Sequence, residues 1–261
     1  MRIMFLNQQP RRSRDDGSHE RVQALLSSYA SPGTEVELCY PDDTGVRVEE
    51  RIRSELPYAV TLPALIRKAV WAEQNGYDAV IQSNTFDPGV EASRLAVRIP
   101  VIGLCRTTVL AAACLADRIG ITVPFDGYDL VARRLLRTYG LHHFATDIRS
   151  FGMTGFDMPR DEIAARAAET MRALVRETGA ECIVPLGGAV IPYVVSTEEL
   201  EREVGVPVLN TKSIGIRFAE TCVHLGLTQS PRTYPKGDLR VEGLRRESAG
   251  ALRYRGIEPR G

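Results

Sequence analysis

Short apolar runs alternate with longer stretches of helical spacing along the chain. Compact runs typical of β-strands occur at 2–6, 35–40, 78–81, 100–103, 119–123, 144–148, 182–184 and 207–209. Apolar residues at helical spacing predict helices at 62–74, 104–115, 129–138, 161–178 and 213–225. This strand–helix alternation predicts an α/β fold in which helices cover both faces of parallel sheets.

One β-α-β pattern occurs twice. The first copy begins GYDAVI at Gly76, continues through SNT at 83–85, and ends IPVI at 99–102. The second begins GAECIV at Gly179, continues through LGG at 186–188, and ends VPVL at 206–209. Unrelated β-α-β units also share this order, and that alternative stays open. A duplicated fold would place 83–85 and 187–188 on opposite walls of one cleft, because parallel sheets bind ligands beyond the carboxyl ends of their strands.

The repeat suggests how the chain is divided. We expect one half to comprise residues 1–107 plus 210–235, and the other half to comprise 108–209. Residues 236–261 are rich in Arg and Gly and have weak periodicity. We expect this tail to be solvated; a strap across a partner subunit is the alternative.

Composition and charge exclude several classes of function. The chain has 33 basic and 33 acidic residues, and this balance argues against nucleic-acid or anionic-membrane partners. The start of the chain does not resemble a secretory signal, and the longest later apolar run, 109–116, is too short to span a membrane. Five scattered cysteines without a CxxC pair argue against zinc sites and fit a reducing cytosol. We therefore expect a cytoplasmic protein with no bound metal.

Two predicted turns carry the main candidate chemistry. Ser83, Asn84 and Thr85 offer two hydroxyls, an amide and backbone N–H groups at the start of a predicted helix, which would attract an anion. Plain helix capping is the alternative, since these residue types are preferred caps. Gly187 and Gly188 would let the backbone approach a ligand closely, or would form a tight turn alone.

Other polar residues end or follow predicted strands, or lie near the start of predicted helices. They are Asn7, Gln8, Asp87, Arg106, Thr122, Asn210 and Thr211. Asp87 is interpreted either as a first-turn acidic cap or as a base. Lys212 and Tyr193 are further candidates for proton transfer, because each is close to a turn expected to face the cleft.

Several stretches together resemble one family. They are MRIMFLN at 1–7, GYDAVIQSNTFDPG at 76–89, IPVIG at 99–103, LGGA at 186–189, and LGLTQS at 225–230 followed by RTY at 232–234. The chain resembles the aspartate/glutamate/hydantoin racemase superfamily, which also includes maleate isomerases and arylmalonate decarboxylases. The match is closest to the hydantoin racemase branch, and it covers roughly residues 1–235.

The resemblance implies two pseudo-symmetric flavodoxin-like halves with the active site in the cleft between them. It also implies chemistry by two cysteines, one removing a proton from an α-carbon and the other returning it on the opposite face. Here the first cysteine position falls on Asn84, or on Ser83 in the alternative alignment. The second falls on Gly188, with Gly187 as the alternative.

The expected function follows from this pattern. We expect a cofactor-independent, isomerase-like enzyme that forms a homo-oligomer. Its expected reaction moves a proton at a carbon next to a carbonyl of a small carboxylate, hydantoin or cyclic imide. This reaction would not use the pair of cysteines. The expected catalytic residues are Ser83, Asn84, Thr85 and Gly188, and the expected substrate-binding residues are Asn7, Gln8, Asp87, Arg106, Thr122, Gly187, Asn210 and Thr211. A lyase, decarboxylase or hydrolase on the same scaffold is the alternative. A non-catalytic protein that binds small anions is the alternative from another class.

Overall fold

Two parallel sheets form the framework of the protein. The computed structural model describes residues 1–11, 17–45 and 56–236, so most of the predicted tail lies outside the described residues. The first sheet has the order β2-β1-β3-β4 and the second has the order β6-β5-β7. The strands are β1 (Arg2–Leu6), β2 (Glu35–Cys39), β3 (Ala79–Gln82), β4 (Val101–Gly103), β5 (Ile119–Val123), β6 (Ala145–Ser150) and β7 (Cys182–Pro185). All pairings are parallel, as predicted.

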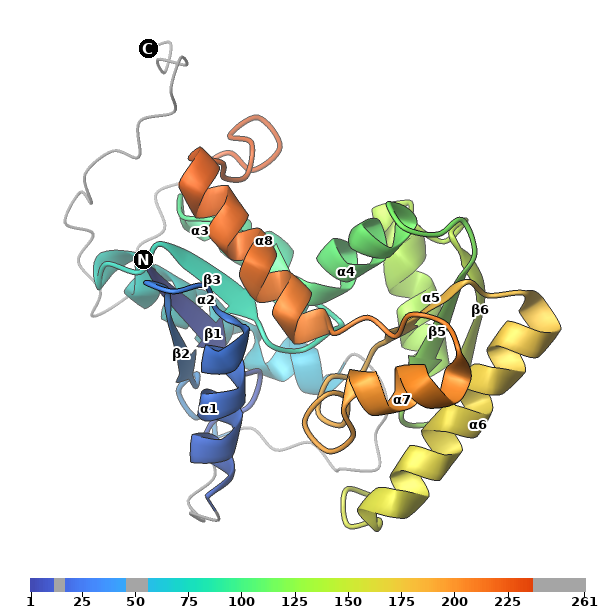
Figure 1. The fold of residues 1–261 in the computed structure, drawn as a ribbon. Helices are drawn as coiled ribbons and strands as arrows, with labels where there is room; N and C mark the ends of the chain where they lie inside the picture. The colour runs from blue at the N-terminus through green and yellow to red at the C-terminus, as the bar shows by residue number, and fades with distance from the viewer. Residues whose placement is uncertain (12–16, 46–55, 237–261) are drawn as a thin grey trace.

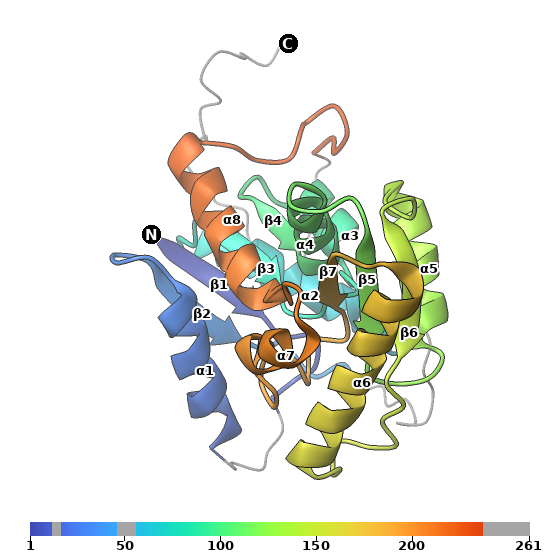
Figure 2. The same ribbon diagram turned by 45° about the vertical axis from the view of Figure 1, so that its right-hand side comes forward.

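Helices separate the strands along the described chain. They are α1 (Ser18–Tyr29), α2 (Leu56–Gln74), α3 (Val90–Ala96), α4 (Leu104–Ala113), α5 (Tyr128–Tyr139), α6 (Arg160–Thr178), α7 (Thr197–Val204) and α8 (Thr211–Leu225). Figure 1 shows the two sheets on either side of α4, with α8 running across the first sheet, and Figure 2 shows the same elements after rotation. The predicted α/β class is therefore confirmed.

The central strands are largely apolar because both faces of each sheet are covered, whereas the edge strands β2 and β6 also carry polar residues. In β1, Met4 and Leu6 pack in a cluster that includes residues of α2 and α3, whereas Ile3 and Phe5 pack in a cluster that includes α1 and α8. This follows from the alternation of side chains along a strand. In the second sheet, Ile121 packs with α4 and α5 residues, while α6 and α7 cover the opposite face.

Two helices connect the sheets. α4 follows directly on β4 of the first sheet, but its Cys105, Val109 and Ala112 belong to the core of the second sheet. α8 follows the second sheet, but its Ile216 and Ala219 pack with strands of the first. The two helices also pack on each other. The predicted boundaries of the halves, at 107/108 and 209/210, stay a prediction.

Several element predictions need correction. Residues 207–209 do not form a full strand: Val208 makes a single parallel bridge with Ile183, and Pro207 has no N–H with which to extend the ladder. α2 begins at Leu56 rather than at 62, with Pro63 inside the helix. α3 begins only at Val90, so the turn at 83–85 does not open a helix.

Candidate functional site

The loop after β3 meets the loop after β7 at Thr85. The Thr85 Oγ1 atom accepts hydrogen bonds from the backbone N–H groups of Gly187 at 2.5 Å and Gly188 at 3.2 Å. Thr85 is completely buried. The structure therefore brings together the two segments that the repeat places on opposite sides of one cleft, in direct contact.

Lys212 lies beside this contact, in the first turn of α8. Its side chain is completely buried, and its Nζ donates a hydrogen bond to the backbone oxygen of Ser83 at 2.6 Å. The ammonium also lies over the Tyr193 ring, 5.6 Å from the centroid. Burial lowers the pKa of Lys212 to about 7, against the opposing effect of the Asp87 carboxylate. An amine with this pKa can both accept and donate a proton near neutral pH. Thr85, Gly187, Gly188, Ser83 and Lys212 are called the lysine cluster below.

The two glycines make room for the protein's own side chains. A Cβ atom on Gly188 would lie 2.1 Å from the Lys212 Nζ and 3.2 Å from the Thr85 Cγ2. Gly187 has a φ of 87°, and a Cβ atom there would lie 2.3 Å from Cδ of Pro124. The predicted close approach is therefore made by Lys212 and Pro124 in this structure.

Asn84 is held by its own turn and by Gln8. Its Oδ1 accepts from the N–H of Phe86 at 2.8 Å, and its Nδ2 donates to the Gln8 Oε1 at 2.7 Å. Gln8 is buried and also donates to the backbone oxygen of Pro57 at 3.4 Å. Asn7 is half-buried and its Oδ1 accepts from the N–H of Gln9 at 3.1 Å. The structure therefore joins Gln8 to Asn84, whereas Asn7 shapes the local turn.

Asp87 caps α4 rather than α3. Its carboxylate accepts hydrogen bonds from the N–H of Cys105 at 2.9 Å, the N–H of Arg106 at 3.2 Å and the hydroxyl of Tyr139 at 3.1 Å. Its φ of 51° turns the chain toward the helix, and a Cβ on Gly103 would lie 2.6 Å from its Oδ2. Burial raises the pKa of Asp87 to about 6, although these hydrogen bonds lower it. Asp87 and its donors Cys105, Arg106 and Tyr139 are called the aspartate cluster below.

Arg106 points away from the lysine cluster. Its guanidinium is 3.9 Å from a Glu91 carboxylate oxygen and lies over the Tyr139 ring at 5.3 Å, with 42% of its side chain exposed. The backbone N–H of Arg106 thus binds Asp87, but the Arg106 side chain does not reach Thr85 or Lys212.

The remaining predicted residues border the lysine cluster through the backbone. The Asn210 Oδ1 accepts from the N–H groups of Lys212 and Ser213, both at 3.1 Å, and so caps α8. The backbone oxygen of Thr122 accepts from the N–H of Leu186 at 2.8 Å. Thr122 and Thr211 are buried, and in the described part of the chain their hydroxyls have no hydrogen-bond partner. Unpaired buried hydroxyls are rare and are available to a ligand or water.

Lys212 is the residue that the sequence analysis undervalued. Its signal is positional: Lys212, Gly215, Ile216 and Ala219 are all buried and follow helical spacing. A lysine on the apolar stripe of a helix is unusual because burying its charge is costly.

The cysteines lie elsewhere. Cys39, Cys105, Cys182 and Cys222 are buried, and Cys114 is exposed. Burial and the nearby Asp87 carboxylate raise the pKa of Cys105 well above that of a free thiol. Within the described ranges, no group of three or more His, Cys, Asp or Glu residues has the arrangement of a metal site. No helix in those ranges has the length and apolar character needed to cross a membrane.

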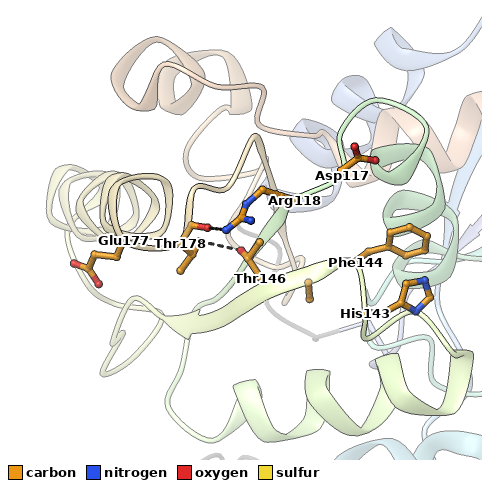
Figure 3. Close-up of a pocket in the computed structure, with 8 residues that line it drawn as sticks. Asp117, Arg118, His143, Phe144, Thr146, Glu177 and Thr178 are labelled. Atoms are coloured by element: carbon orange, nitrogen blue, oxygen red, sulfur yellow. Dashed lines mark hydrogen bonds between the residues drawn. The ribbon is translucent and has the colours of Figure 1, made fainter.

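A separate surface hollow of about 400 Å³ lies near the amino end of the second sheet. Figure 3 shows Arg118, just before β5, beside Thr178 at the end of α6. The Thr178 hydroxyl forms a hydrogen bond of 2.9 Å with that of Thr146 on β6. Since parallel sheets bind ligands at their carboxyl ends, the lysine cluster is the stronger candidate site.

Comparisons with known proteins agree with this fold and identify a family. The family described as Asp/Glu/Hydantoin racemase matches residues 19–219. A hydantoin racemase from Pseudomonas sp. (strain NS671) is 32% identical over 179 residues, which are 67% of this chain and 70% of the relative. Allantoin racemase from Pseudomonas fluorescens has a similar structure, with a TM-score of 0.79, 23% identity, and coverage of 92% of this chain and 99% of that one. Arylmalonate decarboxylase is more distant, with a TM-score of 0.57, 17% identity, and coverage of 88% and 96%.

Proposed function

Since the chain belongs to the Asp/Glu/hydantoin racemase family, we propose that it catalyses proton transfer at a carbon next to a carbonyl of a small carboxylate, hydantoin or cyclic imide. The observation that carries this proposal is the contact of Thr85 with Gly187 and Gly188. It joins the loops at the carboxyl ends of both sheets, beside a buried amine. The relatedness to a hydantoin racemase supports the choice of substrate class.

The chemistry needs a base and donors for the developing charge. When a proton leaves the α-carbon, the electron pair moves onto the carbonyl oxygen, which then needs hydrogen-bond donors. The Thr85 Oγ1 accepts two N–H bonds, so its own hydrogen is free to point at such an oxygen. The buried hydroxyls of Thr122 and Thr211 are further donors near the lysine cluster. We propose that this reaction uses neither a cofactor nor a pair of thiols.

Hydrogen–deuterium exchange tests the proposal directly. The protein is incubated in D₂O with 5-benzylhydantoin, allantoin, aspartate and glutamate, each as separate enantiomers, and the α-proton is followed by NMR. We expect exchange of at least one hydantoin well above the buffer rate. Thr85→Val should reduce that rate, and Thr146→Val, at the hollow near the other sheet edge, is the matched control and should keep it. Thermal stabilisation by these compounds without exchange would instead support a binding protein and contradict the enzyme.

Decarboxylation is the second candidate. The lysine cluster contains one basic side chain, that of Lys212, whereas racemisation by two bases needs one base on each face of the carbon. Loss of CO₂ from a malonate-type diacid forms the same carbanion, and one proton donor then completes the reaction. Release of CO₂ from phenylmalonate, with one enantiomer in excess when a methyl-substituted phenylmalonate is used, would support this candidate over racemisation.

A further inference from the structure

Lys212 has fewer hydrogen-bond partners than a buried ammonium requires. An ammonium carries three N–H groups. Among the residues that the structure describes, its one hydrogen bond goes to the neutral backbone oxygen of Ser83, and no carboxylate is within ion-pair distance. A methionine would fill a similar volume without the cost of burying a charge. Packing therefore does not account for an amine at this position.

The surroundings of Lys212 are shaped to admit its amine. A Cβ at residue 188 would lie 2.1 Å from the Nζ, so a side chain there would require the lysine chain to shift. Asn210 caps the first turn of α8 and fixes the helix end from which Lys212 extends. The amine is thus held where the loop after β3 meets the loop after β7.

The lysine cluster reaches the protein surface. Lys212 and Thr85 are buried, but Ser83, Gly187 and Gly188 are partly exposed. Because residue 188 has no side chain, the Nζ lies directly against the backbone of this partly exposed turn. This location is also the carboxyl end of both sheets, where ligands of parallel α/β folds bind.

We propose that Lys212 is the acid–base residue of this enzyme, and that it acts on one face of the substrate. The inference rests on the proposed function. The neutral amine takes the α-proton, and the C–H electron pair becomes part of an enolate with its charge on the carbonyl oxygen. The resulting ammonium returns a proton to the same carbon from the same side. After exchange with solvent, the product carries deuterium with its configuration retained.

The rate should rise with pH as Lys212 loses its proton. The titratable groups around α8 are Asp87 in the loop after β3, Tyr193 after β7, Cys105 on α4 and Tyr29 on α1. Burial raises the pKa of Tyr193, Cys105 and Tyr29, so these three stay neutral near pH 7. Burial likewise raises the pKa of Asp87, to about 6. We assign the limb of the profile near pH 7 to Lys212. Lys212→Arg should abolish this limb because arginine stays charged, whereas a limb that came from Asp87 would persist in that variant.

The test compares α-proton exchange of 5-benzylhydantoin and of any other active probe in the wild type, Lys212→Met, Lys212→Ala and Lys68→Met. Lys68 lies over the Trp71 ring at 3.8 Å, away from the site, and is the matched control. We expect kcat to fall on the order of 100-fold or more in both Lys212 variants, with an unchanged rate in Lys68→Met. Ethylamine added to Lys212→Ala should restore part of the rate, and ethanol should not.

The outcomes separate the two proposals. If the wild type exchanges and both Lys212 variants stay within about threefold of it, Lys212 is not the acid–base residue and the proposed function stands. Deuteration with full inversion in a single turnover would also overturn the one-face assignment. If the wild type exchanges none of the probes, the proposed function fails and this inference fails with it. Should Lys212→Met not fold, the wild-type pH profile and the ethylamine rescue decide.

Discussion

Two buried clusters join the two sheets, and they differ in how many hydrogen bonds their charged group makes. In the aspartate cluster, Asp87 accepts from two backbone N–H groups and one tyrosine hydroxyl. In the lysine cluster, the one acceptor of Lys212 among the described residues is neutral, the backbone oxygen of Ser83. Burial moves both pKa values toward neutrality, to about 6 and about 7.

The difference distinguishes a structural group from a reactive one. A buried charge with several hydrogen bonds repays part of its desolvation cost and fixes the elements that supply the donors. A buried charge with one partner costs stability, and such costs are concentrated at functional sites. Sequence alone makes Asp87 the more attractive base, whereas the hydrogen bonds favour Lys212.

The largest expected effect is on the pH dependence of stability in Lys212→Met. The folded pKa of about 7 lies below the ordinary value of 10.5, so wild-type stability is lost as the pH falls from 10.5 toward 7. At about 1.4 kcal/mol per pH unit, the variant should gain up to about 5 kcal/mol below pH 7 and little at pH 10.5. Urea unfolding at pH 6, 8 and 10 measures this. A variant less stable than the wild type at pH 6 would show that the buried lysine stabilises the fold, and would contradict the difference drawn between the two clusters.

The second effect concerns the contact between the loops. Thr85→Val keeps the shape of the side chain but leaves the N–H groups of Gly187 and Gly188 without their acceptor, at an expected cost of about 2–4 kcal/mol. Thr85→Ser keeps the oxygen and should cost much less. Thermal and urea unfolding of both variants provide the comparison. Equal losses would show that the threonine methyl group, and not the hydrogen bonds, holds the loops together.

The smallest effect is expected in the aspartate cluster. Tyr139→Phe removes one of three donors to Asp87, and two backbone donors remain, so the free energy of unfolding should fall by about 1 kcal/mol. The exchange rate should stay within about twofold. Tyr128→Phe, whose ring packs edge-on against Phe86, is the matched control for losing a tyrosine hydroxyl. A large loss of exchange in Tyr139→Phe would give Asp87 a direct part in the reaction.

The alternation of strands and helices was predictable, and the failures have local causes. α1 was not predicted because it buries only Leu26 completely and its sequence is largely polar. The apolar spacing predicts this helix only from residue 62, whereas α2 begins at Leu56 and contains Pro63. In the first turns of α2, the Thr61 hydroxyl donates to the backbone oxygens of Pro57 and Tyr58 at 3.3 and 3.1 Å.

The site was predictable as two segments but not as a set of contacts. The repeat indicated that 83–85 and 187–188 face each other, because equivalent loops of a duplicated fold lie at equivalent strand ends. It did not indicate that the space beside Gly188 is taken by a side chain from α8. The position of the Lys212 Nζ depends on how α8 packs against the first sheet. Neither the spacing of residues nor the composition of the chain predicts this packing. The functional roles of the predicted site residues stay predictions.

The collision between a Cβ at residue 188 and the Nζ of Lys212 also constrains how this protein can evolve. A side chain gained at 188 would require the lysine chain to shift, and it would meet less resistance once the lysine has been replaced by a shorter residue. The effects of mutations at the two positions are therefore expected to depend on each other.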